Sequence, residues 1–500
     1  MQLITRCHLK IFLFASCVAA SLVLVGCKST GDVLGMFSGG SDSGSQSQDT
    51  QGKFIDSVKS DLNINNDSRN PKQQLALWQQ DIGYVRYGNK TIANIPLLQN
   101  YVNDVLVRLH GGLRGKPTQV KIFITPQKNF EAYTLEHGAI FVSLGTLLAL
   151  KNEDELAALL AHEYAHVLLS HHAKDTFELL TRYGMRYANV YLQASAESGR
   201  EQKTQMRTLQ IANWVSDKAL FPNWNKGQEN DADILAVDLV IQAGYNADAV
   251  IAMLKKVELT VLEKKEFIEQ NPVKVSKKAK ENSKLNVDLD VLAANAVGNL
   301  EQQLDRDYES AKVRQKQVRS YIKREYKKRA RPSYLTRSYQ AKFTQRETSA
   351  RVKQYTSAHK AEQTLLDKQD LNQAARLGAR SIGGSIGEDP YTRMLMYNIR
   401  NAQAYTDKAQ INLNKAYATN GAPMYTYELL VKQHMEKKQF DQARILLEEM
   451  DAVFIKPDEI LPNLITARKR SGKSTFSYLM RCLTSGDMEL IKQCNQASGK

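Results

Sequence analysis

The chain is poor in cysteine, and three of its five cysteines lie among the first 27 residues. Only Cys482 and Cys494 follow them, so the rest of the chain allows at most one disulfide. These two thiols would pair in an oxidising compartment and stay reduced in the cytosol. If they pair, the small loop that they close would contribute about 3 kcal/mol of stability in the chain-entropy description.

Long apolar runs are also scarce. The run near the start, Ile11 to Val25, is shorter than the roughly 20 residues of a membrane-spanning helix. Arg6 and Lys10 precede it and give it the basic start of an export signal. We therefore assign residues 1–26 to a signal peptide, with an uncleaved N-terminal anchor as the alternative.

The end of this run, Leu24-Val25-Gly26-Cys27, resembles a bacterial lipobox. The resemblance implies that Cys27 is lipidated and becomes the mature N-terminus, held on a membrane by its acyl chains. Lys28 follows, where an Asp would favour the inner membrane, so the expected location is the periplasmic face of the outer membrane. Residues 27–69 begin with a stretch rich in Gly, Ser and Gln, which predicts a flexible tether.

The chain does contain the order His162-Glu163-x-x-His166 inside an apolar helical run. Because one helical turn separates the two histidines, both can bind one metal ion at roughly 2.0 to 2.1 Å. Glu163 can take a proton from a water molecule that attacks a carbonyl group. The motif therefore predicts a catalytic zinc site with Glu163 as the general base, against the alternative of a chance match. His171 and His172 are expected to be surface or supporting groups.

A catalytic zinc site needs a third protein ligand, and the acidic stretch from Glu229 to Asp233 is the candidate. With the first motif it resembles the membrane-associated zinc metallopeptidase family (gluzincins) of the HtpX, CAAX prenyl protease and BepA/LoiP type. There, a helix reading E-x-x-A-D supplies the third ligand. The resemblance covers roughly Leu75 to Gln345. It implies that Glu229 binds zinc and that Asp233 orients a ligand histidine, whereas an acidic, solvated helix start is the alternative.

Two of the places where the chain departs from this family concern the candidate zinc site. Lys226 stands where the family often has Arg, so the charge is kept but the planar guanidinium is lost. Arg331-Pro332-Ser333 stands where a His-Pro-Ser is common, so no histidine from this segment can cap the open zinc position. The resemblance also implies that the strand just before the motif helix is an exposed edge, to which an extended peptide can add.

The predicted fold is mainly α, with a helical zincin peptidase domain in residues 70–350 that includes a small sheet (α+β). Apolar spacing predicts two or three helices in residues 71–112 and strands at Val120–Thr125 and Ala139–Ser143. Residues 183–223, between the two ligand helices, are expected to be either a lid or packing.

Positive charge is concentrated in residues 301–360, where 17 Lys and Arg face 6 Asp and Glu, an excess of 11 out of the formal +15. We interpret about 257–330 as a basic helical insertion and the charged stretch as a solvated helical face. Anionic lipids or acidic glycans are the alternative partners. Nucleic acid is not an expected partner for an exported protein.

Residues 351–500 are predicted to be a C-terminal array of α-helical hairpins. The segment 427–450 resembles a tetratricopeptide (TPR) helix pair, with Ala443 at a close-packing position, but the array has no Trp-x-x-Leu-Gly signature. Ser471–Thr475 lacks the glycine and the preceding strand of a phosphate loop, which excludes that site. The expected helices are 359–377, 391–405, 409–417, 424–435 and 441–450.

These features predict a lipid-anchored, periplasmic zinc metalloendopeptidase with one zinc ion per chain. The family resemblance implies polypeptide substrates such as misassembled or damaged envelope proteins, and outer-membrane assembly proteins as partners. Two alternatives stay open. The helical array could make the protein an assembly or chaperone-like factor with little proteolysis, or the basic segment could bind lipopolysaccharide or peptidoglycan.

Overall fold

The computed structural model describes residues 53–58, 62, 71–111, 113, 119–171, 225–271, 289–367 and 370–499. Two compact units divide the chain, Met1–Gln51 and Gly52–Lys500, and all described residues belong to the second. The predicted signal peptide, Cys27, His172 and the segment 183–223 lie outside the described residues.

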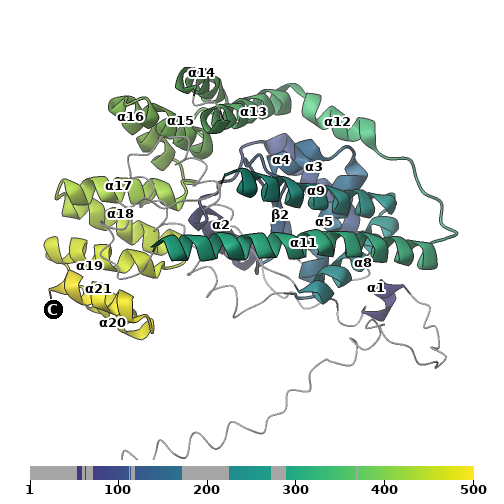
Figure 1. The fold of residues 1–500 in the computed structure, drawn as a ribbon, viewed down its shortest axis with the longest axis horizontal. Coiled ribbons are helices and arrows are strands. Elements are labelled where there is room, and N and C mark those ends of the chain that lie inside the picture. The colour runs from purple at the N-terminus through teal and green to yellow at the C-terminus, as the bar shows by residue number, and fades with distance from the viewer. Residues whose placement is uncertain are drawn as a thin grey trace, which may run out of the picture. The chain divides into compact units, whose positions relative to one another are not determined.

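The described part is mainly helical with one small sheet, which confirms the predicted fold class (Figure 1). The first part of the unit contains α1 (Phe54–Ser57), α2 (Pro71–Tyr87), α3 (Pro96–His110), β1 (Lys121–Thr125), β2 (Ala132–Thr134), β3 (Ala139–Ser143), α4 (Leu144–Ala149), α5 (Glu153–Leu168), α8 (Lys226–Gln242), α9 (Asp248–Gln270) and α11 (Leu289–Glu325). It is followed by α12 (Thr336–Thr344), α13 (Arg346–Asp367), α14 (Leu371–Ser381), α15 (Pro390–Ala402), α16 (Thr406–Tyr417), α17 (Met424–Glu436), α18 (Phe440–Val453), η2 (Asp458–Ile460), α19 (Leu461–Arg470), α20 (Phe476–Thr484) and α21 (Met488–Ser498).

The sheet has three strands in the order β1-β3-β2, with β1 parallel and β2 antiparallel to β3. The expectation that the strand before the motif helix is an exposed edge is therefore wrong. That strand, β3, is the central one and is buried at all five positions, because it has a neighbour on each side. The strand that lies against α5 is β2, an end strand of three residues that the sequence analysis missed.

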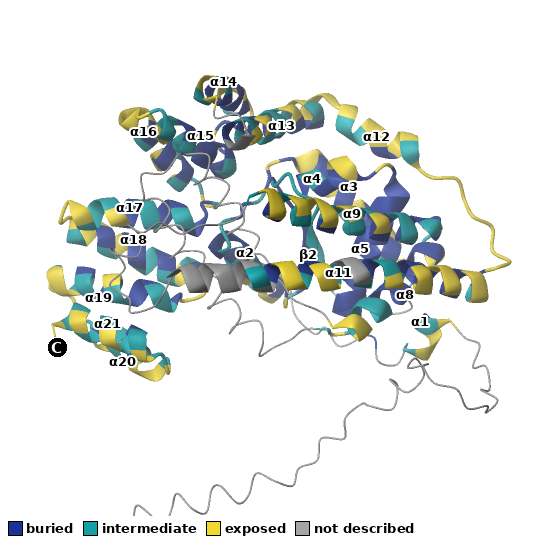
Figure 2. Ribbon diagram, in the orientation of Figure 1, coloured by how far each residue is buried: buried dark blue, intermediate teal, exposed yellow. Residues whose placement is uncertain are grey.

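The motif helix α5 is buried along its whole length (Figure 2). The side chain of Asn152 caps its start by accepting a hydrogen bond from the backbone N–H of Glu155. Burial of the acidic first turn would be costly without partners. Glu153 therefore accepts hydrogen bonds from the hydroxyls of Tyr101 (2.7 Å) and Tyr245 (3.0 Å). These contacts fix the direction in which α5 enters the core.

The long helix α11, teal in Figure 1, packs against α9 and α8. Buried apolar residues recur along it at helical spacing: Leu300, Leu304, Ala311, Val318 and Ile322. The predicted solvated helical face thus describes only the outer side of this helix. Helix α9 continues to Gln270, so its last part lies within the predicted helical insertion of about 257–330.

One end of the predicted tether is packed rather than flexible. The backbone N–H of Ile55 donates to Asp238 (2.8 Å), and that of Phe54 donates to the hydroxyl of Tyr321 (2.7 Å). Ile55 and Leu62 join the core that surrounds α5. The tether prediction for residues 27–69 is therefore wrong at residues 53–58 and 62.

The C-terminal helices pack largely as neighbouring pairs: α13 with α14, α15 with α16, and α17 with α18. Ala443 is fully buried in α18, as its close-packing position required. The single helix predicted at 359–377 is wrong, because α13 ends at Asp367 and α14 begins at Leu371. The side chain of Asp370 caps this new start by accepting from the N–H of Gln373.

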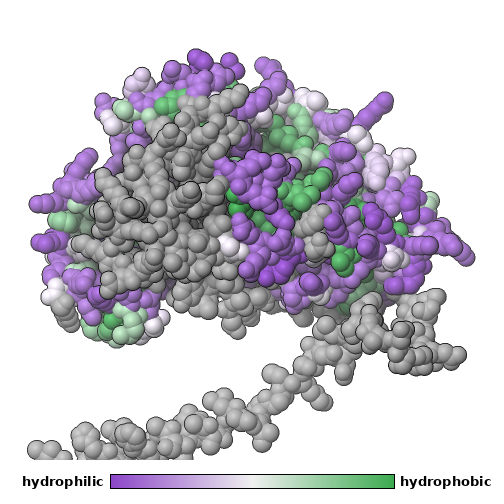
Figure 3. Space-filling view, in the orientation of Figure 1, coloured by the Kyte–Doolittle hydropathy of each residue, from purple (hydrophilic) through white to green (hydrophobic). Residues whose placement is uncertain are grey.

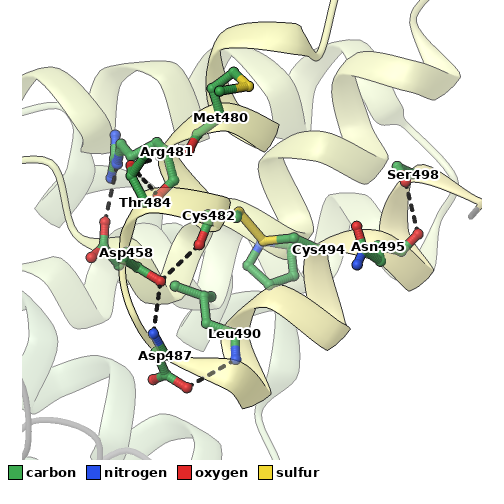
Figure 4. Close-up of a disulfide and its surroundings, with 12 residues drawn as sticks. Asp458, Met480, Arg481, Cys482, Thr484, Asp487, Leu490, Cys494, Asn495 and Ser498 are labelled. Atoms are coloured by element: carbon green, nitrogen blue, oxygen red, sulfur yellow. Dashed lines mark hydrogen bonds and ion pairs between the residues drawn. A yellow bond between two sulfur atoms is a disulfide. The ribbon is translucent and has the colours of Figure 1, made fainter. Parts of the chain in front are cut away.

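A disulfide joins Cys482 of α20 to Cys494 of α21 (Figure 4). Replacing both cysteines by serine is expected to lower the stability of this helix pair by about 3 kcal/mol, because the unfolded chain regains the freedom of the opened loop. Thermal unfolding and hydrogen exchange in α20 and α21 would measure the loss. An unchanged melting temperature with unchanged exchange would contradict the prediction.

Candidate metal centre

The two motif histidines face each other across one turn of α5. The Nε2 atoms of His162 and His166 lie 3.3 Å apart, and the two rings stand nearly perpendicular, at 89°. Both side chains are almost wholly buried. One turn of a rigid, buried helix thus aims two imidazole nitrogens at the same point.

Helix α8 brings a carboxylate to that point. Asn225 and Gln228 form a reciprocal capping box that starts α8 at Lys226 and places Glu229 in its first turn. One carboxylate oxygen of Glu229 lies 3.6 Å from Nε2 of His162, and the other lies 3.7 Å from Nε2 of His166. The three residues offer ligand atoms that all lie within 4.8 Å of one another.

This donor set fits a single zinc ion. Ligand atoms about 2.0 to 2.1 Å from a tetrahedral zinc stand roughly 3.3 to 3.4 Å from each other. The two Nε2 atoms stand 3.3 Å apart, at that value, and the two oxygens of Glu229 lie 3.6 and 3.7 Å from one Nε2 atom each. Two imidazoles and one carboxylate also leave a fourth position open, as in catalytic zinc sites.

The outer nitrogen of each histidine has a partner as well. Nδ1 of His162 lies 2.9 Å from a carboxylate oxygen of Asp233, one turn after Glu229 on α8. Nδ1 of His166 lies 3.0 Å from Nδ1 of His171. Partners at Nδ1 fix the ring orientation and leave Nε2 to bind the metal. His171 thus takes the supporting position, one of the two that the sequence left open.

A residue that the sequence analysis missed, Arg314 of α11, joins the two acids of α8. Its Nε and Nη2 donate to the carboxylate of Asp233 (2.6 and 2.8 Å), and its Nη1 lies 2.6 Å from Glu229. Its side chain is only 11% exposed. A sequence signal existed, because Arg314 stands at helical spacing between the buried Ala311 and Val318.

The carboxylate of Glu163 is held from the sheet side. The hydroxyl of Thr134, in β2, lies 2.9 Å from a carboxylate oxygen of Glu163 and 3.1 Å from its backbone carbonyl oxygen. Burial raises the pKa of Glu163, and the hydrogen bond from Thr134 and the charge of His162 only partly offset this effect. A carboxyl group with a raised pKa is a stronger base than one in water.

The charges around the centre shift two further pKa values. Burial alone would raise the pKa of Asp233, but the Arg314 guanidinium and His162 together outweigh it and lower this pKa to about 2. Burial lowers the pKa of His162, yet the carboxylates of Asp233 and Glu229 leave it raised. Because a histidine binds a metal ion as the neutral imidazole, metal binding competes with the proton that these carboxylates favour.

The other residues singled out in the sequence lie apart from the centre. Lys226 is exposed at the start of α8. Arg331 is exposed and forms an ion pair with Asp248 (2.6 Å), while the N–H of Leu335 donates to Asp154 at the opposite end of α5. The segment 331–335 thus supplies no ligand to the centre, and the guanidinium beside the candidate ligands comes from α11.

Two histidines one helical turn apart, a glutamate beside the first and a further glutamate from a second helix are the features of a zinc metallopeptidase centre. Comparison with known proteins agrees with this class. Residues 96–318 match the peptidase family M48, so this part of the chain is similar to M48 metallopeptidases.

Three relatives illustrate how distant the similarity is. The chain is 24% identical over 180 residues to the beta-barrel assembly-enhancing protease of Escherichia coli (35% of this chain, 36% of the relative). It is 23% identical over 176 residues to metalloprotease YcaL of the same species (35% and 65%). It is 26% identical over 175 residues to the mitochondrial metalloendopeptidase OMA1 of Schizosaccharomyces pombe (34% and 48%). The matches thus span between 36% and 65% of these relatives' lengths.

Proposed function

We propose that the protein is a zinc-dependent endopeptidase that hydrolyses peptide bonds in polypeptide substrates. The observation that carries this proposal is the convergence of His162, His166 and Glu229 on one point, with Glu163 beside them. The match to peptidase family M48 supports the same reaction class.

In this proposal His162, His166 and Glu229 hold one zinc ion. When bound, zinc polarises the scissile carbonyl group and lowers the pKa of a water molecule to about 7. Glu163 takes the proton of the attacking water and passes it to the leaving amine. Because the attacking group is water, no covalent bond forms between the chain and the substrate.

The surrounding residues orient the ligands. Asp233 holds Nδ1 of His162, and a proton at Nδ1 of His166 can be donated to His171. Arg314 contacts Glu229 and Asp233 together, so it fixes one α8 acid against the other and offsets their charge. Such partners matter because a ligand that is free to rotate spends less time in the binding geometry.

Replacing Arg314 by methionine is expected to weaken zinc binding about 10-fold to 100-fold. The apolar side chain fills a similar space but leaves the carboxylates of Asp233 and Glu229 without their guanidinium. Competition with a fluorescent zinc chelator would measure the affinity. Arg319→Met is the matched control, because Arg319 is an exposed residue of the same helix. Equal zinc affinities of the two variants would contradict the role given to Arg314.

We also propose that Cys27 is lipidated and holds the protein at the periplasmic face of the outer membrane. The lipobox-like residues support this, and two bacterial relatives are named as a metalloprotease and a beta-barrel assembly-enhancing protease. None of the described helices is long and apolar enough to cross a bilayer. Misassembled envelope proteins are the substrate class that fits this location.

The helical array favours a second candidate function, a binding role in envelope assembly. Hydrogen bonds attach the array to the peptidase part: Nε of Arg86 donates to the carbonyl of Ala422 (2.9 Å), and the backbone N–H of Asn94 donates to the hydroxyl of Tyr355 (2.8 Å). A polypeptide bound to the array would therefore stay attached to the peptidase part. If a Glu163→Gln variant corrected all defects of a deletion strain, the binding role alone would explain the function of the protein in the cell.

Cleavage of casein tests the enzymatic proposal directly. The purified protein is expected to degrade casein, to stop when a zinc chelator is added, and to resume when zinc is restored. Cleavage that continues in the presence of the chelator would contradict a zinc-dependent reaction.

A further inference from the structure

One face of α20 is apolar and exposed. Phe476, Met480 and Leu483 follow one another at spacings of four and three residues, and they are 71%, 43% and 52% exposed. Residues at this spacing share one side of a helix. Met488, at the start of α21, is 77% exposed. Apolar surface gathers over α20 in the space-filling view (Figure 3).

The other face of α20 is fixed against its neighbours. Cys482 is buried and bonded to Cys494, and Leu461, Ile465 and Leu490 complete this small core. Figure 4 shows Met480 on the side of α20 away from the disulfide. The apolar face therefore cannot turn inward without breaking the disulfide and the core beneath it.

Basic residues outnumber acidic ones around this face, where Asp487 and Glu489 are the acids beside Met488. From Leu461 to Thr484 the chain has five Lys and Arg and no Asp or Glu. Arg470 and Lys473 are exposed just before α20, and Lys492 is exposed one turn after Met488 on α21. A helix that exposes large apolar side chains among basic residues has the pattern of an interfacial membrane helix.

We propose that the face formed by Phe476, Met480, Leu483 and Met488 docks on an anionic lipid bilayer. The apolar side chains would enter the boundary between headgroups and acyl chains, while the basic residues contact lipid phosphates. Four side chains are too few for a stable dimer, which buries about 800 Å² on each partner. This contact is independent of the proposed proteolysis and would hold the C-terminal end of the array at the membrane surface.

Tryptophan fluorescence in the full chain tests this contact locally, whatever else anchors the protein. A Phe476→Trp variant is mixed with vesicles whose phosphatidylglycerol and phosphatidylcholine carry brominated acyl chains, which quench inserted indoles. We expect the emission of the introduced tryptophan to shift to shorter wavelength and to be quenched. Ile445→Trp on α18 is the matched control, since Ile445 is 54% exposed but lies outside this face. Its emission should stay unchanged.

Charge variants then test the choice of partner. In the Phe476→Trp chain, Arg470→Gln with Lys473→Gln should weaken binding to anionic vesicles about thirtyfold, because each basic residue near such a surface contributes about 1 kcal/mol. Absence of quenching, equal quenching of the Ile445→Trp control, or equal binding to vesicles of phosphatidylcholine alone would overturn the proposal. The proposal would also be overturned if the indole were already shielded before vesicles are added and the chain sedimented as a dimer. A second copy of the chain would then cover this face.

Discussion

A Glu163→Gln variant is expected to cleave peptides about a thousandfold more slowly than the unaltered protein, while it still binds zinc. Glutamine keeps the shape of the side chain and can still contact the hydroxyl of Thr134, but it cannot accept the proton of the attacking water. The three candidate ligands are unchanged. Cleavage of a fluorogenic peptide, measured with metal analysis of the same sample, would separate loss of the base from loss of the metal.

Glu301→Gln is a suitable control for this variant, because it removes an exposed glutamate on the outer side of α11. It should cleave at the rate of the unaltered protein. If Glu163→Gln retained full activity with its zinc, Glu163 would not be the base, and the proton would have to be taken by another group.

A His166→Ala variant is expected to bind zinc at least about a hundredfold more weakly and to lose cleavage with the metal. The remaining donors, His162 and Glu229, come from two helices and leave two positions of the metal to solvent. Zinc should no longer raise the melting temperature, because a ligand stops stabilising the folded state when its dissociation constant exceeds its free concentration.

His171→Ala provides the graded comparison for this prediction. His171 lies 3.0 Å from the outer nitrogen of His166, so its removal should weaken zinc binding less than removal of His166 itself. The affinity for zinc is therefore expected to decrease from the unaltered protein to His171→Ala and then to His166→Ala. If His171→Ala lost more affinity than His166→Ala, the assignment of ligand and supporting residue would be wrong.

The pair of histidines and Glu163 could be predicted because their chemistry is contained within one turn of one helix. Apolar spacing identified that helix, and the structure shows that the side chain of Asn152 caps its start. Glu229 and Asp233 needed the family resemblance, since an acidic helix start is common without a metal. Their position beside the histidines then depends on how α8 packs on α5, which local sequence does not determine.

Arg314 could not be recognised in the same way, because it meets Asp233 from 81 residues further along the chain. A basic stretch of helix is usually solvated. A buried cation in it is recognised only from its spacing relative to the apolar seam, the row of buried apolar residues along the helix. In α11 most Lys and Arg do lie on the outer side, and Arg314 is the one that follows the seam of Ala311 and Val318. That seam was visible in the sequence but was outweighed by the net charge.

The errors in the sheet and the array have different physical origins. Strand order is set by tertiary packing, so the position of β3 at the centre was not readable from its alternation, and β2 is too short to alternate clearly. The break between α13 and α14 did have a local signal. Asp370 followed by Gln373 is a helix-capping pattern that should have divided the predicted helix.

The most direct test of the account is X-ray absorption at the zinc edge of the purified protein, combined with its zinc content. We predict one zinc per chain with two imidazole nitrogens and carboxylate oxygen at about 2.0 to 2.1 Å and no sulfur ligand. This signal should be lost in a His162→Ala, His166→Ala double variant. A protein without zinc, or a double variant that keeps the same zinc spectrum, would contradict the proposed metallopeptidase centre.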